Sequence, residues 1–236
     1  DTPEARELYS VPIQGGTSRR LNSALPSGAS VNRFDITPDS RRVIFQAPQE
    51  NVNVWELYSV PIQGPANAAV KLNPPLPFNG DVGFTEFDDV FLIAPDGSRV
   101  VYHADQDTEG MNELYSVPVE GPASEVIKLN PPIVNGGGLY VLYGAMAISP
   151  DSARVVYRAA LDTPGTYEIY SVPIAGPSTA TVKLNGVMVP DEQIDGFQIT
   201  SDGSRVVYSG AQLQENVIEL FSVPIAGPAS TGVKLN

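Results

Sequence analysis

The chain has 236 residues, and its 27 acidic and 14 basic side chains give a formal net charge of −13. This charge repels phosphate backbones and anionic lipid headgroups, and no apolar run is long enough to span a bilayer, so we expect no binding of nucleic acid and no membrane insertion. The absence of Cys and the single His exclude disulfides, thiolate chemistry and most His-based metal or triad sites.

Three phrases recur along the chain. The first, ELYSVPI or a close variant, begins at Glu7, Glu56, Glu113, Glu168 and Glu219. The second ends in Leu-Asn and follows each copy, at 19–22, 70–73, 127–130, 182–185 and 233–236. The third precedes only the last four copies and begins at Phe34, Phe91, Met146 and Phe197. A period of about 50 residues is typical of a propeller blade.

Each complete unit predicts four short strands separated by turns. We name them A (F-x-I), B (R-V-V-Y), C (E-L-Y-S-V-P) and D (V-K-L-N). A Pro-Asp-Gly or Pro-Asp-Ser turn joins A to B, where Pro suits the first corner and Asp bonds the following backbone. We expect strand A near 33–37, 90–94, 145–149 and 196–200.

The predicted fold is therefore all-β, a propeller of four-stranded antiparallel blades in a single domain, 1–236. Four blades are complete, at about 33–73, 90–130, 145–185 and 196–236, and a half blade with strands C and D alone covers 1–32. The Pro of strand C cannot donate a ladder hydrogen bond, so it belongs at the end of the strand or at a bulge. The Lys of strand D is typical protection for an exposed sheet edge.

The motifs resemble a known family. The turns Ala94-Pro95-Asp96-Gly97 and Ser149-Pro150-Asp151-Ser152, each followed by R-V-V-Y and then by E-L-Y-S-V-P or E-I-Y-S-V-P, resemble the TolB-like propeller repeat of bacterial extracytoplasmic proteins. The resemblance covers nearly the whole chain. It implies a repeat architecture and a secreted, surface or periplasmic location. It implies no single activity, since relatives include periplasmic scaffold proteins and the gating propellers of serine peptidases.

The strand count does not balance. Four A-B pairs and five C-D pairs make four and a half blades, and the missing half would be an A-B segment just before Asp1. One interpretation is that the chain is a portion of a longer propeller. The other is that a partner chain or an imperfect fifth blade completes a ring. The open half blade predicts self-association in either case.

The variable connections, B-to-C and D-to-A, are expected on one face, which is the candidate binding surface. Its aromatic and acidic residues are Trp55, Phe78, Phe84, Phe87, Asp88, Asp89, Tyr140 and Tyr143. The alternative is that these aromatic side chains fill the gaps between blades and the mouth of the channel.

Other polar residues suggest chemistry less directly. Asp105, Asp107 and Glu109 alternate before a Gly, as at the start of a calcium loop, but no Glu follows at the twelfth position. Calcium is thus the one cofactor that the sequence suggests, and an Asx turn is the alternative. The Asp and Arg of each A-to-B turn recur in every blade, which favours a structural role. His103 takes the place of Gln46, Arg158 and Ser209 in the other blades, and we expect it to be exposed.

The sequence favours a non-catalytic binding or scaffold module for a protein or glycan partner. One alternative is a glycoside-active propeller, whose candidate acids would be Asp88, Asp89 and Asp191. Another is a gating propeller separated from its peptidase. No G-x-S-x-G nucleophile elbow occurs in the sequence.

Overall fold

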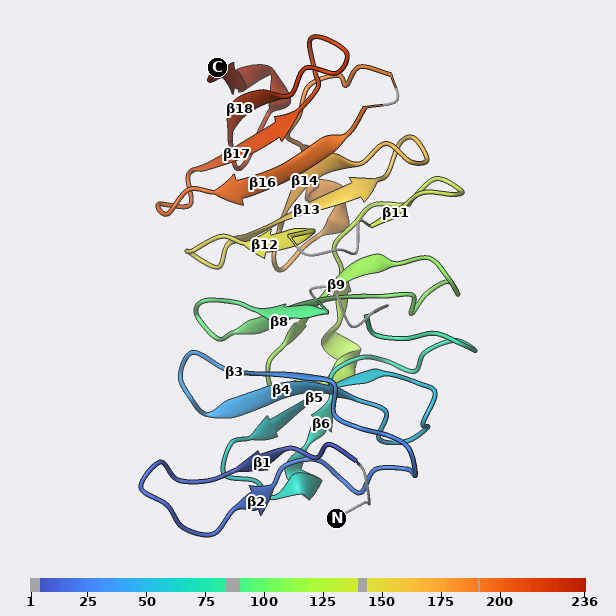
Figure 1. Ribbon diagram of the computed structural model, residues 1–236, viewed down its shortest axis with the longest axis vertical. Helices are drawn as coiled ribbons and strands as arrows, with labels where there is room; N and C mark the ends of the chain where they lie inside the picture. The colour runs from blue at the N-terminus through green and yellow to red at the C-terminus, as the bar shows by residue number, and fades with distance from the viewer. Residues whose placement is uncertain (1–4, 84–89, 140–143, 191) are drawn as a thin grey trace.

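The computed structural model describes residues 5–83, 90–139, 144–190 and 192–236. In these ranges the secondary structure consists of strands and short 3-10 turns, with no α-helix. The sheets stack along the longest axis of the molecule, from the N-terminal half blade to the C-terminal blade, and the chain ends lie at opposite ends of this axis (Figure 1). The array is therefore an open stack in which each blade has a neighbour only above or below it.

Each complete blade is an antiparallel sheet with the strand order A-B-C-D, and the sheet of the third blade has a fifth strand. Blade 1 contains β3 (Arg33–Ile36), β4 (Arg42–Ala47), β5 (Glu56–Pro61) and β6 (Val70–Lys71). Blade 2 contains β7 (Phe91–Ile93), β8 (Arg99–Ala104), β9 (Glu113–Pro118) and β10 (Ile127–Lys128).

Blade 3 contains β12 (Met146–Ile148), β13 (Arg154–Ala160), β14 (Glu168–Pro173) and β15 (Val182–Lys183), and β11 (Gly138–Leu139) also pairs with β13. Blade 4 contains β16 (Ile194–Ile199), β17 (Arg205–Gly210), β18 (Glu219–Pro224) and β19 (Val233–Lys234). The C-to-D loops hold the 3-10 turns η1 (Ala66–Ala68), η2 (Ala123–Glu125), η3 (Ser178–Ala180) and η4 (Ala229–Thr231).

The half blade is a separate two-stranded sheet. It consists of β1 (Tyr9–Ser10) and β2 (Arg19–Arg20), with Tyr9 opposite Arg20 and Ser10 opposite Arg19. These strands correspond to C and D, so the predicted arrangement of four blades and a half blade is confirmed. The Pro of strand C is the last residue of its strand in every complete blade, as in β5, which also agrees with the sequence prediction.

The A-to-B turns show why their sequence recurs. In blade 4 the Asp202 carboxylate accepts hydrogen bonds from the Thr200 hydroxyl at 2.6 Å and from the Ser204 backbone N–H at 3.0 Å. The next residue has a positive φ, which Gly203 adopts at 71° without a steric penalty from a Cβ. The hydrogen bonds favour the charged carboxylate, so the pKa of Asp202 is lowered to about 2.

The hydrophobic core is divided into four parts, one at each junction between neighbouring sheets. At the junction of blades 1 and 2, Leu57 and Leu72 of blade 1 pack with Tyr102 and Val117 of blade 2. The other three clusters repeat this arrangement. Both faces of a middle blade are thus buried, which explains the continuous apolar runs of strands B and C.

Candidate functional site

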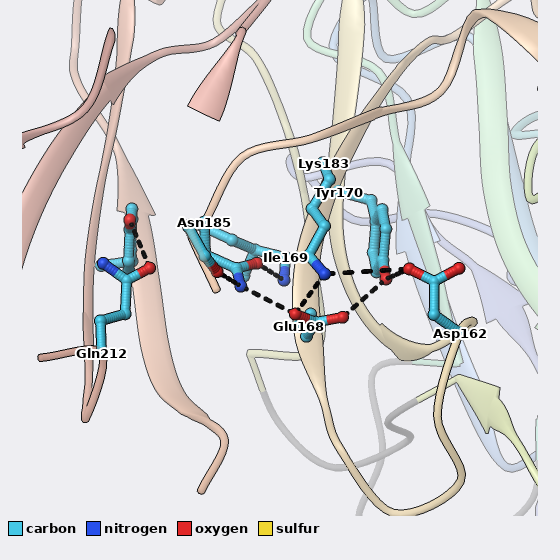
Figure 2. Close-up of polar contacts among 9 residues, drawn as sticks. Asp162, Glu168, Ile169, Tyr170, Lys183, Asn185 and Gln212 are labelled. Atoms are coloured by element: carbon cyan, nitrogen blue, oxygen red, sulfur yellow. Dashed lines mark hydrogen bonds and ion pairs between the residues drawn. The ribbon is translucent and has the colours of Figure 1, made fainter. Parts of the chain in front are cut away.

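A buried Glu at the start of strand C is the centre of a repeated polar cluster. The Oε1 atom of Glu56 lies 2.8 Å from the Nζ atom of Lys71 in strand D, and its Oε2 atom accepts a hydrogen bond from the Tyr58 hydroxyl at 2.7 Å. In blade 3 the same contacts join Glu168, Lys183 and Tyr170 (Figure 2). We call this group the Glu-Lys-Tyr cluster. Blade 4 retains the ion pair but has Phe221 at the Tyr position.

The electrostatics of the cluster explain its composition. Burial, followed by the negative charge of Glu168, raises the pKa of the Tyr170 hydroxyl, so this hydroxyl remains protonated and donates to the carboxylate. Burial alone would lower the pKa of Lys71, but its hydrogen bonds to Glu56 and Glu50 outweigh this effect and raise it. The Lys of strand D therefore neutralises a buried carboxylate, a role that its prediction as edge protection did not include.

A hydrogen-bond pattern that recurs in every repeat also explains the Asn that ends each repeat. The Oδ1 atom of Asn185 accepts a hydrogen bond from the Ile169 backbone N–H at 2.9 Å, and its Nδ2 atom donates to Glu168 at 3.1 Å and to the Gly186 carbonyl at 2.8 Å (Figure 2). Asn22, Asn73, Asn130 and Asn236 accept the equivalent backbone hydrogen bond. The side-chain oxygen of the Asn accepts the hydrogen bond that a backbone carbonyl of strand D would otherwise accept from strand C. The regular pairing of strand D therefore ends at this residue.

The recurrent Arg of strand B has a structural role, as its repetition predicted. The Nε atom of Arg154 donates to the Ser171 hydroxyl at 2.7 Å, and its Nη2 atom donates to the Ser171 carbonyl at 3.2 Å. The same two bonds join Arg42 to Ser59, Arg99 to Ser116 and Arg205 to Ser222. The guanidinium groups thus hold strand C in each complete blade.

The prediction that His103 is exposed is wrong, because only 3% of its surface is accessible. Gln46 and Arg158 at the equivalent positions are also buried. Gln46 donates to the Val82 carbonyl in the D-to-A connection that follows in sequence, and Arg158 donates to the carbonyl of Ile194, the first residue of β16. The Nδ1 atom of His103 lies 3.2 Å from the Oδ1 atom of Asn112, so the imidazole helps to position a loop.

The B-to-C hairpins and the D-to-A connections form what we call the loop face. Of its predicted binding residues, Phe78 is 84% exposed and Trp55 is partly buried. The Trp55 backbone N–H donates to the Asp81 carboxylate at 2.7 Å, so a B-to-C hairpin and a D-to-A connection are joined here. The other six predicted binding residues, Phe84, Phe87, Asp88, Asp89, Tyr140 and Tyr143, lie outside the described residues, as does Asp191.

Asp81 is the residue of this face that the sequence analysis missed. Its backbone N–H donates to the Asp105 carboxylate at 2.6 Å, while its own carboxylate holds Trp55. Burial, together with the charge of Asp105, raises the pKa of Asp81, although the Trp55 N–H opposes the shift. Because Asp81 stands in a connection that is not repeated, no internal comparison could have identified it.

The three carboxylates of the suggested calcium loop have separate partners in the protein. Asp105 accepts hydrogen bonds from the backbone N–H groups of Asp81 and Gly110, Asp107 lies 3.1 Å from the Lys128 Nζ atom, and Glu109 accepts a hydrogen bond from the Asn79 amide. Among the described residues, no group of three or more His, Asp and Glu side chains is arranged to hold a metal ion. The geometry therefore adds no support to calcium binding, which stays a prediction from the sequence.

No protein-family model and no curated protein sequence matches the chain. Solved structures do match. A putative dipeptidyl aminopeptidase IV from Bacteroides ovatus aligns with 94% of the chain at 12% identity, with a TM-score of 0.57. TolB from Acinetobacter baumannii aligns with 97% of the chain at 15% identity, with a TM-score of 0.47.

The chain spans 32% of the length of the first of these proteins and 48% of the second. At this level of identity, the likeness concerns the fold. No helix in the described part of the chain is long and apolar enough to cross a membrane. The four-stranded repeat, its stacked sheets and the similarity to a solved structure together show that the chain has a β-propeller fold, with four blades and a half blade.

Proposed function

We propose that the chain is a non-catalytic binding or scaffold module of an extracytoplasmic protein and that it holds a protein or glycan partner on its loop face. The observation that carries the proposal is the location of the exposed apolar side chains of the complete blades. Val52, Phe78, Val187, Leu213, Val217 and Ile218 are exposed, and all lie in B-to-C or D-to-A connections. Among the described residues, no large hydrophobic side chain is exposed in the A-to-B turns or in the C-to-D loops of the complete blades.

This difference in exposed apolar side chains supports a binding role for the loop face. The same blades carry both sets of loops, so the blades themselves do not account for the difference. Loops carried by a rigid scaffold are common binding sites, and apolar side chains gathered on one face favour contact with a partner. A protein partner would cover these side chains directly. A glycan partner would use Phe78 as a stacking surface beside the polar groups of Asn79 and Asp81.

The polar clusters of the blades support a non-catalytic module. Each buried Glu is neutralised by the Lys of strand D or, in the half blade, by Arg20. A carboxylate that is buried, ion-paired and repeated in every blade is suited to stability and not to a single reaction. The alternative of a glycoside-active propeller rests on Asp88, Asp89 and Asp191, which lie outside the described residues.

A second candidate function is a propeller that gates access to a peptidase. The fold similarity to a putative dipeptidyl aminopeptidase IV favours this candidate. Such a propeller would also be non-catalytic, and its partner would be a peptidase domain. Both proposals therefore describe a non-catalytic propeller, and they differ only in the partner that it binds.

The test compares matched variants of the two faces. The immobilised chain is incubated with an extracytoplasmic protein fraction and, separately, with a glycan array. We expect a specific partner that is retained by the wild type and by Glu125→Ser on the opposite face but is lost by Phe78→Ser. Both positions are exposed, so the fold is preserved in each variant. Equal retention by the two variants, or hydrolysis of an array glycan, would contradict the proposal.

A further inference from the structure

The half blade forms one wall of an apolar groove. The groove has a volume of about 800 Å³, and its lining includes Tyr9, Val11 and Pro12 of the half blade together with Phe34 and Ile36 of blade 1. The sheet of the half blade has two strands, β1 and β2, whereas strand C of every complete blade lies between strands B and D. The groove therefore occupies the position that strands A and B fill in the other blades.

The exposure of the lining residues shows what is missing from the groove. Phe34 is 56% exposed, whereas Phe91 and Met146, at the same position of strand A in blades 2 and 3, are 2% and 5% exposed. Val11 is 59% exposed, whereas its counterpart Val60 is fully buried. Phe91 packs in a cluster with Ile44, and Met146 in a cluster with Val101, and both partners belong to strand B of the preceding blade. Val60 lies opposite Val43 in strand B of its own blade. A strand B beside β1 would therefore contact both Phe34 and Val11, as it does in the complete blades.

We propose that this groove binds a β-hairpin of the A-B type, supplied by a partner polypeptide, which adds to β1 and completes the fifth blade. The hairpin has an aromatic or Met residue and an Ile in its first strand, a Pro-Asp or Ser-Asp turn, and Arg-Val-Val-Tyr in its second strand. Addition of a strand to a sheet in this way gives affinity through main-chain hydrogen bonds and specificity through alternate side chains.

The register of the hairpin follows from the complete blades. In blade 1, Arg42 lies opposite Pro61 and Phe45 lies opposite Tyr58. By this register, the Arg of the second hairpin strand lies opposite Pro12, and the Tyr of the same strand lies opposite Tyr9. Arg42 donates to the hydroxyl and the carbonyl of Ser59, and Ser10 is the equivalent Ser of the half blade. The hairpin Arg therefore binds Ser10.

A second copy of the chain does not fill the groove in this way. The A-B hairpins of the described blades pair with their own strands C, so none is available for β1. The C-terminal face of blade 4 exposes Leu220, Val233 and Leu235, and it could only cover the half blade from outside. Phe34 would remain exposed, because it needs a strand beside β1.

The test uses a synthetic 15-residue peptide with the sequence of positions 196–210, labelled with a fluorophore and titrated with the whole chain. We expect saturable binding with one peptide per chain. Arg205→Ala in the peptide removes the bonds to Ser10 and is expected to weaken binding roughly tenfold or more. Val11→Asp in the chain is expected to abolish binding, whereas Val233→Asp, at a side chain of matched 56% exposure on the opposite end, leaves it unchanged.

Circular dichroism establishes that each variant is folded, and sedimentation of the chain alone identifies self-association. Absence of saturable binding would overturn the proposal, as would equal effects of Val11→Asp and Val233→Asp. A dimer that the peptide does not dissociate would assign the groove to a second copy and would also overturn it. Phe78→Ser is expected to leave peptide binding unchanged, so this inference and the proposed function of the loop face fail separately.

Discussion

Replacement of Asn130 by Ala tests the role of the Asn that ends strand D. Asn130 is buried, its Oδ1 atom accepts a hydrogen bond from the Leu114 N–H at 2.7 Å, and its Nδ2 atom donates to the Pro131 carbonyl at 2.9 Å. The substitution leaves a buried N–H without its acceptor, which costs about 1–3 kcal/mol, and the second lost bond adds about 1 kcal/mol. We expect the free energy of unfolding to fall by about 2–4 kcal/mol.

The chain offers its own control. Asn236 accepts the same hydrogen bond from the Leu220 N–H at 2.8 Å, but at an exposed site. Water can replace the side chain there, so Asn236→Ala is expected to cost less than about 0.5 kcal/mol. In thermal melts the Asn130 variant should lose about 5–15 °C, because 1 kcal/mol corresponds to about 2–4 °C for a chain of this length.

Hydrogen exchange gives a local measurement of the same effect. The Leu114 amide should lose protection in Asn130→Ala, whereas amides of the half blade should change little because each blade contacts only its neighbours. Equal destabilisation by the Asn130 and Asn236 variants would refute the reasoning, since burial would then make no difference to the bond.

Three further predictions follow from the polar contacts. The pKa of Asp202 is about 2 in the folded chain and 3.8 in its reference state, so its stabilising contribution is present above pH 4 and is lost as the pH falls towards 2. The melting temperature of the wild type should drop over this pH range, and that of Asp202→Asn should drop less. Arg154→Lys loses one of two bonds to Ser171 and should cost about 1–2 kcal/mol by urea unfolding, whereas Arg41→Lys, at a side chain that is 84% exposed, should have no measurable effect. If calcium binds at Asp105, Asp107 and Glu109, millimolar calcium should raise the melting temperature, and chelator or Asp107→Ala should abolish the rise; an unchanged melting temperature would exclude the site.

The fold could be predicted because the sequence repeats its own strands. Each predicted strand A begins within two residues of the observed one, and the surplus half blade was evident from a phrase present five times against another present four times. The constant 15-residue spacing from Glu to Lys, as in Glu56 and Lys71, was also available and would have predicted the ion pair.

Parts of the site could not be predicted, because polarity does not determine burial. His103 and Gln46 differ in chemistry and vary between blades, which suggested solvent exposure, yet both are buried. Gln46 donates to the backbone carbonyl of Val82 in a D-to-A connection, and a backbone partner cannot be recognised from the sequence. Asp81 was missed for a related reason, since its partner Trp55 contributes a main-chain N–H.

The division of the core into separate junctions has a consequence for how such a chain can change length. Each junction is made by side chains of two adjacent blades, and Leu57, Leu114 and Ile169 take equivalent places in three of them. A duplication or deletion of one entire repeat would therefore recreate a junction of the same kind. Gene duplication in whole units could lengthen or shorten this protein in a single step, whereas a duplication of half a unit would leave one sheet without its inner strands.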